Sequence, residues 1–229
     1  MNAMIKLLAC LPLAAVASYA GTITIGAPGN SFDGDCAPFG CAVEYQQVYG
    51  AGQFPGMITI TDLTFFNDNF VPGSIAAANY TISLSTTTAA VDGLDATFAN
   101  NLGADSALFF SGALGGLIGP TNQFTITGTP FTYDPALGNL LLSLTSDGGG
   151  LDFSVFLDFT SGAPAGTFSR AYSFDTSGVA SNLENDTGLV TQFTFSPVTS
   201  AVPEPSSWML LGTALLAVLL ARRMRRQEE

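Results

Sequence analysis

The sequence predicts an all-β fold, an antiparallel β-sandwich of the jelly-roll kind, between two short apolar segments at the chain ends. Short segments of the body, residues 21–200, alternate apolar and polar residues with a period of two. They are rich in Thr, Phe, Ile and Val, and Gly, Pro, Asn and Asp separate them. No long segment of the body carries the 3.6-residue period of an amphipathic helix. About ten such strands with turns between them favour a sandwich.

The clearest alternation identifies five of the expected strands. In one of them Tyr80, Ile82 and Leu84 share a face, and in another Phe153, Val155, Leu157 and Phe159 do so. The five expected strands span residues 22–25, 80–84, 123–127, 152–159 and 189–195.

A further strand, residues 57–66, changes its phase part-way. Ile58 and Ile60 have one parity, whereas Leu63 and Phe65 have the other. A β-bulge near Thr61 and Asp62 would return both pairs to one face. The alternative is that both faces of this strand are partly buried.

Arg170 is in phase with Phe168, Tyr172 and Phe174, so it falls on an apolar stripe. We expect it to pair with an Asp at the sheet margin, or to lay its stem on the aromatic rings with its charge in water. Contact with a ligand is a third reading.

The first 20 residues have the features of a secretory signal peptide. Lys6 precedes an apolar run, Leu7 to Val16, and small residues end at Ala20. We therefore expect signal peptidase to cut before Gly21. A lipoprotein site at Cys10 fits less well, because little apolar chain precedes it.

Cys36 and Cys41 are the two cysteines that remain after cleavage of the signal peptide. Because exported chains meet oxidising conditions, we expect a local disulfide that pins a small loop, with two free thiols as the alternative. A transition-metal site is not expected, since the chain has no His and two thiols do not complete a tetrahedral shell.

The charge of the body excludes one large class of partner. Residues 21–202 contain fifteen acidic residues and one basic residue, a net charge of −14. One arginine cannot neutralise a row of phosphates, so no nucleic acid is expected as a partner.

Composition also argues against catalysis. Without His the usual general base is absent, no GxSxG motif occurs, and the cysteines are expected to be oxidised. A pair of Asp carboxylates acting as a glycosidase is the remaining enzymatic reading. We expect no enzyme.

Two kinds of binding site are weaker possibilities. Acidic loops suit calcium, although Asp and Asn are also ordinary turn formers; the candidates are Asp33, Asp35, Asp68, Asp147 and Asp152. Aromatic residues in or near loops could stack on glycans or belong to the core; these are Tyr45, Tyr49, Phe54, Phe131 and Tyr133.

The C-terminal region, residues 201–229, has three parts in a fixed order. Pro203-Glu204-Pro205 precedes an uncharged run of fourteen residues, Trp208 to Ala221, and a basic cluster follows. That cluster consists of Arg222, Arg223, Arg225 and Arg226. A helix over the run covers about 21 Å at ~1.5 Å per residue, which is short for a bilayer core of ~30 Å. Trp208 at one interface and snorkelling arginines at the other suit a single transmembrane helix with a cytoplasmic tail.

This ending resembles the PEP-CTERM sorting signal of bacterial exported proteins. The resemblance implies recognition by an exosortase, a membrane protease with a catalytic cysteine that acts near the Pro-Glu-Pro. It also implies a bacterium that makes exopolysaccharide and a biofilm matrix. A plain membrane anchor is the alternative, and a glycolipid-anchor signal fits less well because the chain ends in basic residues.

Together these features predict an exported, non-enzymatic surface or extracellular-matrix protein. We expect transient anchoring in the inner membrane with the body outside the cytoplasm, followed by transfer to the cell surface or matrix. A carbohydrate-binding module for the cell's own exopolysaccharide is the alternative, and an Asp-based glycosidase is a weaker one.

Overall fold

The computed structural model describes residues 20–27, 34–67, 73–118, 123–148, 155–198, 211–216 and 222–223. The chain divides into two units, Met1–Val198 and Thr199–Glu229. Within the described parts, the first unit contains twelve strands and two short 3-10 helices, and the second is helical at residues 211–216 and 222–223.

The strands of the first unit form two larger sheets and a small ribbon, in which every pair is antiparallel. The four-stranded sheet has the order β1 (Gly21–Ile25), β12 (Thr191–Pro197), β3 (Ile58–Phe66) and β6 (Gln123–Tyr133). The six-stranded sheet has the order β10 (Asn182–Glu184), β9 (Phe168–Ser173), β2 (Glu44–Tyr49), β7 (Asn139–Ser146), β4 (Ser74–Thr87) and β5 (Ala107–Leu117). The ribbon joins β8 (Phe159–Ser161) to β11 (Thr187–Leu189), and the 3-10 helices are η1 (Ala51–Gln53) and η2 (Phe98–Asn101).

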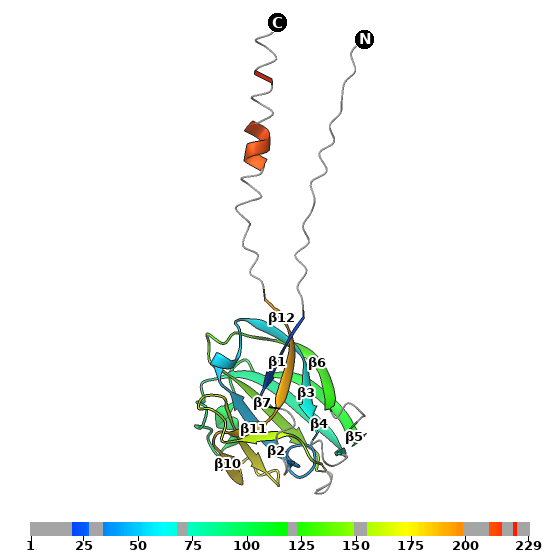
Figure 1. Cartoon of the computed structure of the whole chain (residues 1–229). Coiled ribbons are helices and arrows are strands. Elements are labelled where there is room, and N and C mark those ends of the chain that lie inside the picture. The colour runs from blue at the N-terminus through cyan, green and yellow to red at the C-terminus, as the bar shows by residue number, and fades with distance from the viewer. Residues whose placement is uncertain are drawn as a thin grey trace. The chain divides into compact units, whose positions relative to one another are not determined.

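The predicted all-β sandwich is confirmed, because the two larger sheets share one core (Figure 1). Tyr49 of β2 and Phe193 of β12 belong to different sheets, yet their ring centroids lie 5.0 Å apart. The order β1-β12-β3-β6 against β2-β7-β4-β5 is that of a jelly roll, with β8 to β11 inserted before the last strand. The inner face of each sheet is apolar, because the period-two pattern places the apolar residues of a strand on one side.

The predicted bulge in β3 is confirmed. The register of β3 against both of its neighbours, β6 and β12, skips Thr61. Ile58, Ile60, Leu63 and Phe65 are consequently all buried in the core. The extra residue corrects the phase, as the hydrophobic pattern requires.

The expected strands at residues 22–25, 80–84 and 123–127 lie within β1, β4 and β6. The prediction of a strand at residues 152–159 is wrong for its described part, residues 155–159, because β8 begins only at Phe159. Val155 and Leu157 are buried as the alternation requires, but Leu157 makes single bridges to Asp35 and Asn67 instead of a ladder.

The expected strand at residues 189–195 is interrupted. β11 ends at Leu189, Val190 donates its N–H to Asp158 O (3.0 Å), and β12 begins at Thr191 in a different sheet. Residues 189, 190 and 191 are all buried, because the chain is covered on both sides where it passes from the ribbon to the sheet.

The chain enters and leaves the sandwich at one place, because Gly21 of β1 pairs with Phe195 of β12. Residues 1–19, which contain nearly all of the expected signal peptide, lie outside the described residues. Among the residues that are described, no helix has the length and hydropathy needed to cross a membrane.

Candidate functional site

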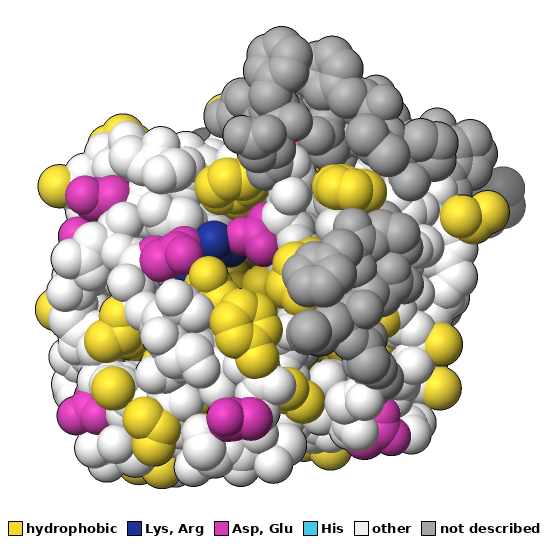
Figure 2. All heavy atoms as spheres, turned by 90° about the horizontal axis from the view of Figure 1, so that it is seen from below, with side chains coloured by type: hydrophobic (Ala, Val, Ile, Leu, Met, Phe, Trp, Pro, Cys, Tyr) yellow, Lys and Arg dark blue, Asp and Glu magenta, His cyan; other side chains and the backbone are white. Residues whose placement is uncertain are grey.

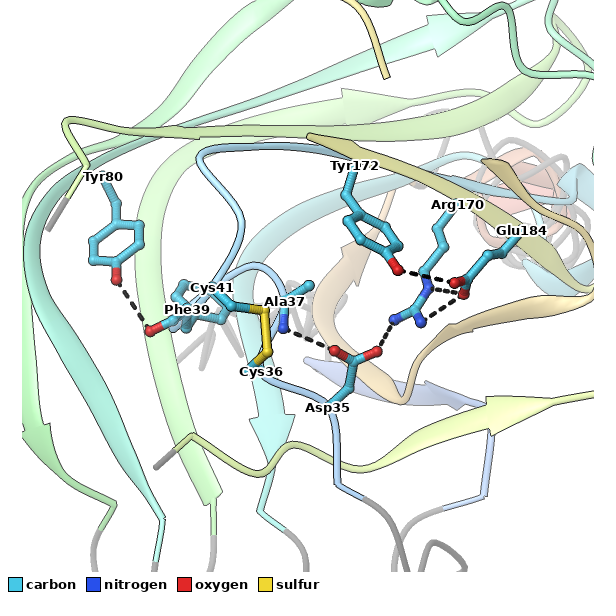
Figure 3. Close-up of a disulfide and its surroundings, with 9 residues drawn as sticks. All are labelled: Asp35, Cys36, Ala37, Phe39, Cys41, Tyr80, Arg170, Tyr172 and Glu184. Carbon is cyan, nitrogen blue, oxygen red and sulfur yellow. Dashed lines mark hydrogen bonds and ion pairs between the residues drawn. A yellow bond between two sulfur atoms is a disulfide. The ribbon is translucent and has the colours of Figure 1, made fainter. Parts of the chain in front are cut away.

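Within the described residues, a buried cluster of charged groups surrounds Arg170 on β9. This side chain is only 4% exposed, and its guanidinium lies between two carboxylates (Figure 3). Nη1 forms an ion pair with Asp35, while Nε and Nη2 contact Glu184 Oε2 at 2.7 and 2.6 Å. The expectation that Arg170 pairs with an Asp is therefore confirmed, and a charge held in water is wrong. Asp35 and Glu184 satisfy the charge, which makes its burial tolerable.

Aromatic rings complete the surroundings of the guanidinium. Its carbon lies 5.5 Å from the ring centroid of Phe159 and 5.3 Å from that of Tyr172, within the range of cation–π attraction. Tyr172 donates its hydroxyl to Glu184 Oε1 (3.0 Å). Burial, followed by the charge of Glu184, raises the pKa of Tyr172 to about 12, so this hydroxyl keeps its proton at neutral pH.

The second carboxylate comes from a loop closed by a disulfide. Cys36 and Cys41 are bonded, with their Cα atoms 5.3 Å apart, and Asp35 immediately precedes them. Asp35 Oδ1 accepts a hydrogen bond from the N–H of Ala37 (2.8 Å), while its other oxygen faces Arg170. The disulfide therefore closes the loop, and the ion pair between Asp35 and Arg170 connects the loop to β9.

Phe39 anchors the same loop in the core. Its side chain is fully buried, and its ring centroid lies 5.0 Å from the rings of Phe65 and Phe124. Closing so short a loop with a disulfide contributes roughly 2 kcal/mol in the chain-entropy model. Loss of a buried Phe side chain costs about 3–5 kcal/mol. By these figures the buried ring of Phe39 contributes at least as much to the stability of the folded body as the disulfide does.

Two of the five calcium candidates lie in the described residues, and both are engaged. Asp35 pairs with Arg170, and Asp147 accepts from Asn79 N (3.0 Å) and Asn79 Nδ2 (2.6 Å). The other three, Asp33, Asp68 and Asp152, lie outside the described residues. Asp35, Cys36 and Cys41 place potential ligand atoms within 4.8 Å, but disulfide sulfurs are not thiolates and do not fit a metal site.

The five aromatic residues considered for glycan stacking are buried in the core, so that hypothesis is wrong for them. They are Tyr45, Tyr49, Phe54, Phe131 and Tyr133, and each is at most 7% exposed. They seemed to lie near loops because strand ends cannot be located from the pattern alone.

An exposed aromatic lies elsewhere, beside the Arg170 cluster. Phe174 is 48% exposed and its ring contacts Tyr172 at 5.6 Å between centroids. We call Asp35, Arg170, Tyr172, Phe174 and Glu184 the acidic-aromatic patch. Figure 2 shows a face of the body on which basic atoms lie between acidic side chains, with hydrophobic side chains next to them. Glu184 and Phe174 were not identified as site residues, because neither residue belongs to a recognisable motif.

The sorting residues lie mostly beyond the described structure. Pro203, Glu204, Pro205, Arg225 and Arg226 are outside it, whereas Arg222 and Arg223 are helical and exposed.

The described body is a β-sandwich with a disulfide, a combination typical of domains that fold in oxidising compartments. Residues 201–226 match the family model described as the PEP-CTERM protein-sorting motif. The chain carries this motif, which implies export, a membrane-anchored C-terminal signal and sorting by an exosortase. No curated protein and no solved structure matches the chain.

Proposed function

We propose that this chain is a non-enzymatic protein of the bacterial surface or extracellular matrix, delivered there by exosortase processing. The observation that carries the proposal is the sorting motif at residues 201–226. The same chain also has an N-terminal segment with the pattern of a signal peptide, so it combines an export signal with a sorting signal.

The tail has the features of a temporary membrane anchor. We propose that the apolar run at residues 208–221 enters the inner membrane, with Trp208 at the outer interface. The four arginines that follow remain on the cytoplasmic side, because positive residues mark that side and resist translocation. The body is then held outside the cytoplasm until the tail is cut.

The Pro-Glu-Pro sequence suits a protease substrate. Proline favours an extended backbone and has no N–H donor, so a sequence with two prolines disfavours a helix. An extended segment at the membrane surface can enter the groove of a membrane protease. Cleavage there releases or transfers the body.

A structural role for the body is supported by the way its ionic groups are used. The carboxylates of Asp35 and Glu184 engage Arg170, Tyr172 and the backbone of Ala37, which occupies oxygens that a glycosidase would need. The sequence also has no His to act as a base.

Deletion of the exosortase gene in the native host tests the proposal. We expect a longer, membrane-bound form in the deletion strain and a shorter, released form in the parent, compared by immunoblot of cell fractions. Replacement of Glu204 by Gln in the parent strain separates motif recognition from indirect effects of the deletion. A protein of unchanged size and location in both cases would contradict sorting.

A carbohydrate-binding function is the second candidate, and the acidic-aromatic patch favours it. Phe174 offers an exposed ring on which a sugar can stack, and the side chain of Glu184 in the same patch is 31% exposed. The ligand class would be the neutral or basic polysaccharide of the cell's own matrix, since the body is strongly acidic.

A pair of matched variants tests this second function. Phe174→Ala should abolish binding to isolated exopolysaccharide. Leu183→Ala should leave it intact, because Leu183 is similarly exposed (49%) and adjoins Glu184 on β10 but points to the other side of the strand. Equal binding of the exopolysaccharide by both variants would exclude the acidic-aromatic patch as the binding site.

A further inference from the structure

Strand β5 forms an open edge of the six-stranded sheet. In the described part of the chain it pairs with β4 on one side, in a register that skips Phe109 and Gly115, and with no strand on the other. The edge is covered at its start, where a Cβ on Gly128 of β6 would lie 2.6 Å from Phe109 O. Beyond that point an edge strand presents N–H and C=O groups that can accept another strand.

This edge lacks the charges that normally protect one. Residues 106–133, which contain both β5 and β6, include no Asp, Glu, Lys or Arg. Lysine and inward-facing charges are the usual protection of edge strands. The body around it has a net charge of −14, so two copies repel each other over most of their surfaces. An uncharged edge is where that repulsion is weakest.

The middle of β5 is complementary to itself in antiparallel pairing. Phe110, Gly112 and Leu114 are half-buried on the core side, and Ser111 and Ala113 are exposed on the other side. With a two-fold axis at Gly112, Phe110 of one copy faces Leu114 of the other, and Ser111 faces Ala113. Large apolar residues thus meet each other, and small ones meet on the outer face.

The same register would complete the core at this edge. Phe110 and Leu114 pack against the core but are only partly covered, as expected for the last strand of a sheet. A Cβ at Gly112 would lie 3.3 Å from Phe110 Cζ, so the glycine leaves room for that ring at the axis. Pairing buries both side chains further.

We propose that β5 is a self-association site, at which two copies of this chain join their six-stranded sheets edge to edge. The occupant is a second β5 in antiparallel register about Gly112. This inference rests on the strand geometry and does not depend on the sorting route, so the two can fail separately.

Charge reversal across the proposed joint tests it. One variant combines Ser111→Asp with Ala113→Asp, and another combines Ser111→Lys with Ala113→Lys. Both positions are exposed, so folding should be retained, and thermal unfolding of each variant verifies this. In the proposed register each variant places two like-charged pairs directly opposite each other.

Sedimentation velocity of the full chain in mild detergent, over a range of concentrations, provides the measurement. We expect the wild type to dimerise, and each variant alone to have a dimer dissociation constant weakened by about tenfold or more. An equimolar mixture of the two variants should recover the dimer, because opposite charges then face each other.

Three outcomes would overturn the proposal: a monomeric wild type, variants that associate as the wild type does, or a mixture that stays dissociated. Association through the membrane tail would be the same in all samples and would not respond to mixing. The Lys variant makes the chain less acidic, so its dissociation would exclude net charge as the cause.

Discussion

Arg170 is the single basic residue between residues 21 and 202, and it lies on an inward-facing stripe of β9. Its burial connects three segments that are distant in sequence: the disulfide loop through Asp35, β9 itself, and β10 through Glu184. A buried ion pair adds little net stability when it forms, but loss of one partner leaves charge without compensation.

Replacement of Arg170 by Met should therefore lower the free energy of unfolding by about 2–4 kcal/mol, below the range for fully buried pairs because Asp35 and Glu184 are partly exposed. The free energy of unfolding of Arg170→Lys should lie between those of the wild type and the Met variant, because Lys keeps the charge but lacks the planar guanidinium. Urea unfolding checks this. A Met variant within about 0.5 kcal/mol of the wild type, the usual effect of a surface substitution, would contradict it.

Asp147 should make stability depend on pH at the acidic end. Hydrogen bonds from the side chain and the backbone of Asn79 hold the pKa of this carboxyl below its ordinary value of about 4. A lowered native pKa gives stability that is present above the unfolded pKa and is lost as the pH falls through the native one. The difference in Tm between wild type and Asp147→Ala should thus shrink below about pH 4. A constant difference from pH 7 to pH 2.5 would argue against this role.

In β3 a single extra residue determines which side chains of the strand face the core. Thr61 occupies the bulge, where its Oγ1 donates to Asp62 Oδ2 (2.7 Å). Without the bulge, either the Ile58 and Ile60 pair or the Leu63 and Phe65 pair would face solvent.

Deletion experiments distinguish the bulge from a regular position. Deleting Thr61 leaves both apolar pairs in phase and should cost about 1–2 kcal/mol, mainly from lost hydrogen bonds. Deleting Thr64 moves Phe65 to the opposite face and should cost at least about 3 kcal/mol, by analogy with loss of a buried Phe. Urea unfolding of the two deletion variants provides the comparison. Equal costs would show that the bulge does not correct the phase.

The whole molecule separates its charges between its two units. The body has a net charge of −14, whereas four of the chain's six basic residues lie within the last eight positions. In the proposed orientation the basic residues beside the apolar run stay on the cytoplasmic side and the acidic body is exported.

A fluorescent protein fused after Glu229 should accordingly fluoresce, and alkaline phosphatase fused there should be inactive, because both would lie in the cytoplasm. A reporter inserted at Val198, where the body ends, should give the opposite result. Alkaline phosphatase and a fluorescent protein provide complementary measurements. An external reporter at Glu229 would contradict the proposed orientation.

The sequence by itself determined the fold class and the sorting motif, and it limited β3 to a bulge or to two partly buried faces. Each of these depends on local order along the chain: the parity of apolar residues in β3, or the succession of Pro-Glu-Pro, apolar run and arginines. Such patterns can be read without knowing which segments meet in space.

The tertiary structure alone decided which strands pair, where Arg170 finds its carboxylates and which aromatic residue remains exposed. Period two shows that a strand has a buried face, but it does not say which strand covers that face. Glu184 lies fourteen residues from Arg170, and Asp35 lies much farther away in the sequence. Contacts of this kind are made by chain folding in three dimensions, so no local pattern records them.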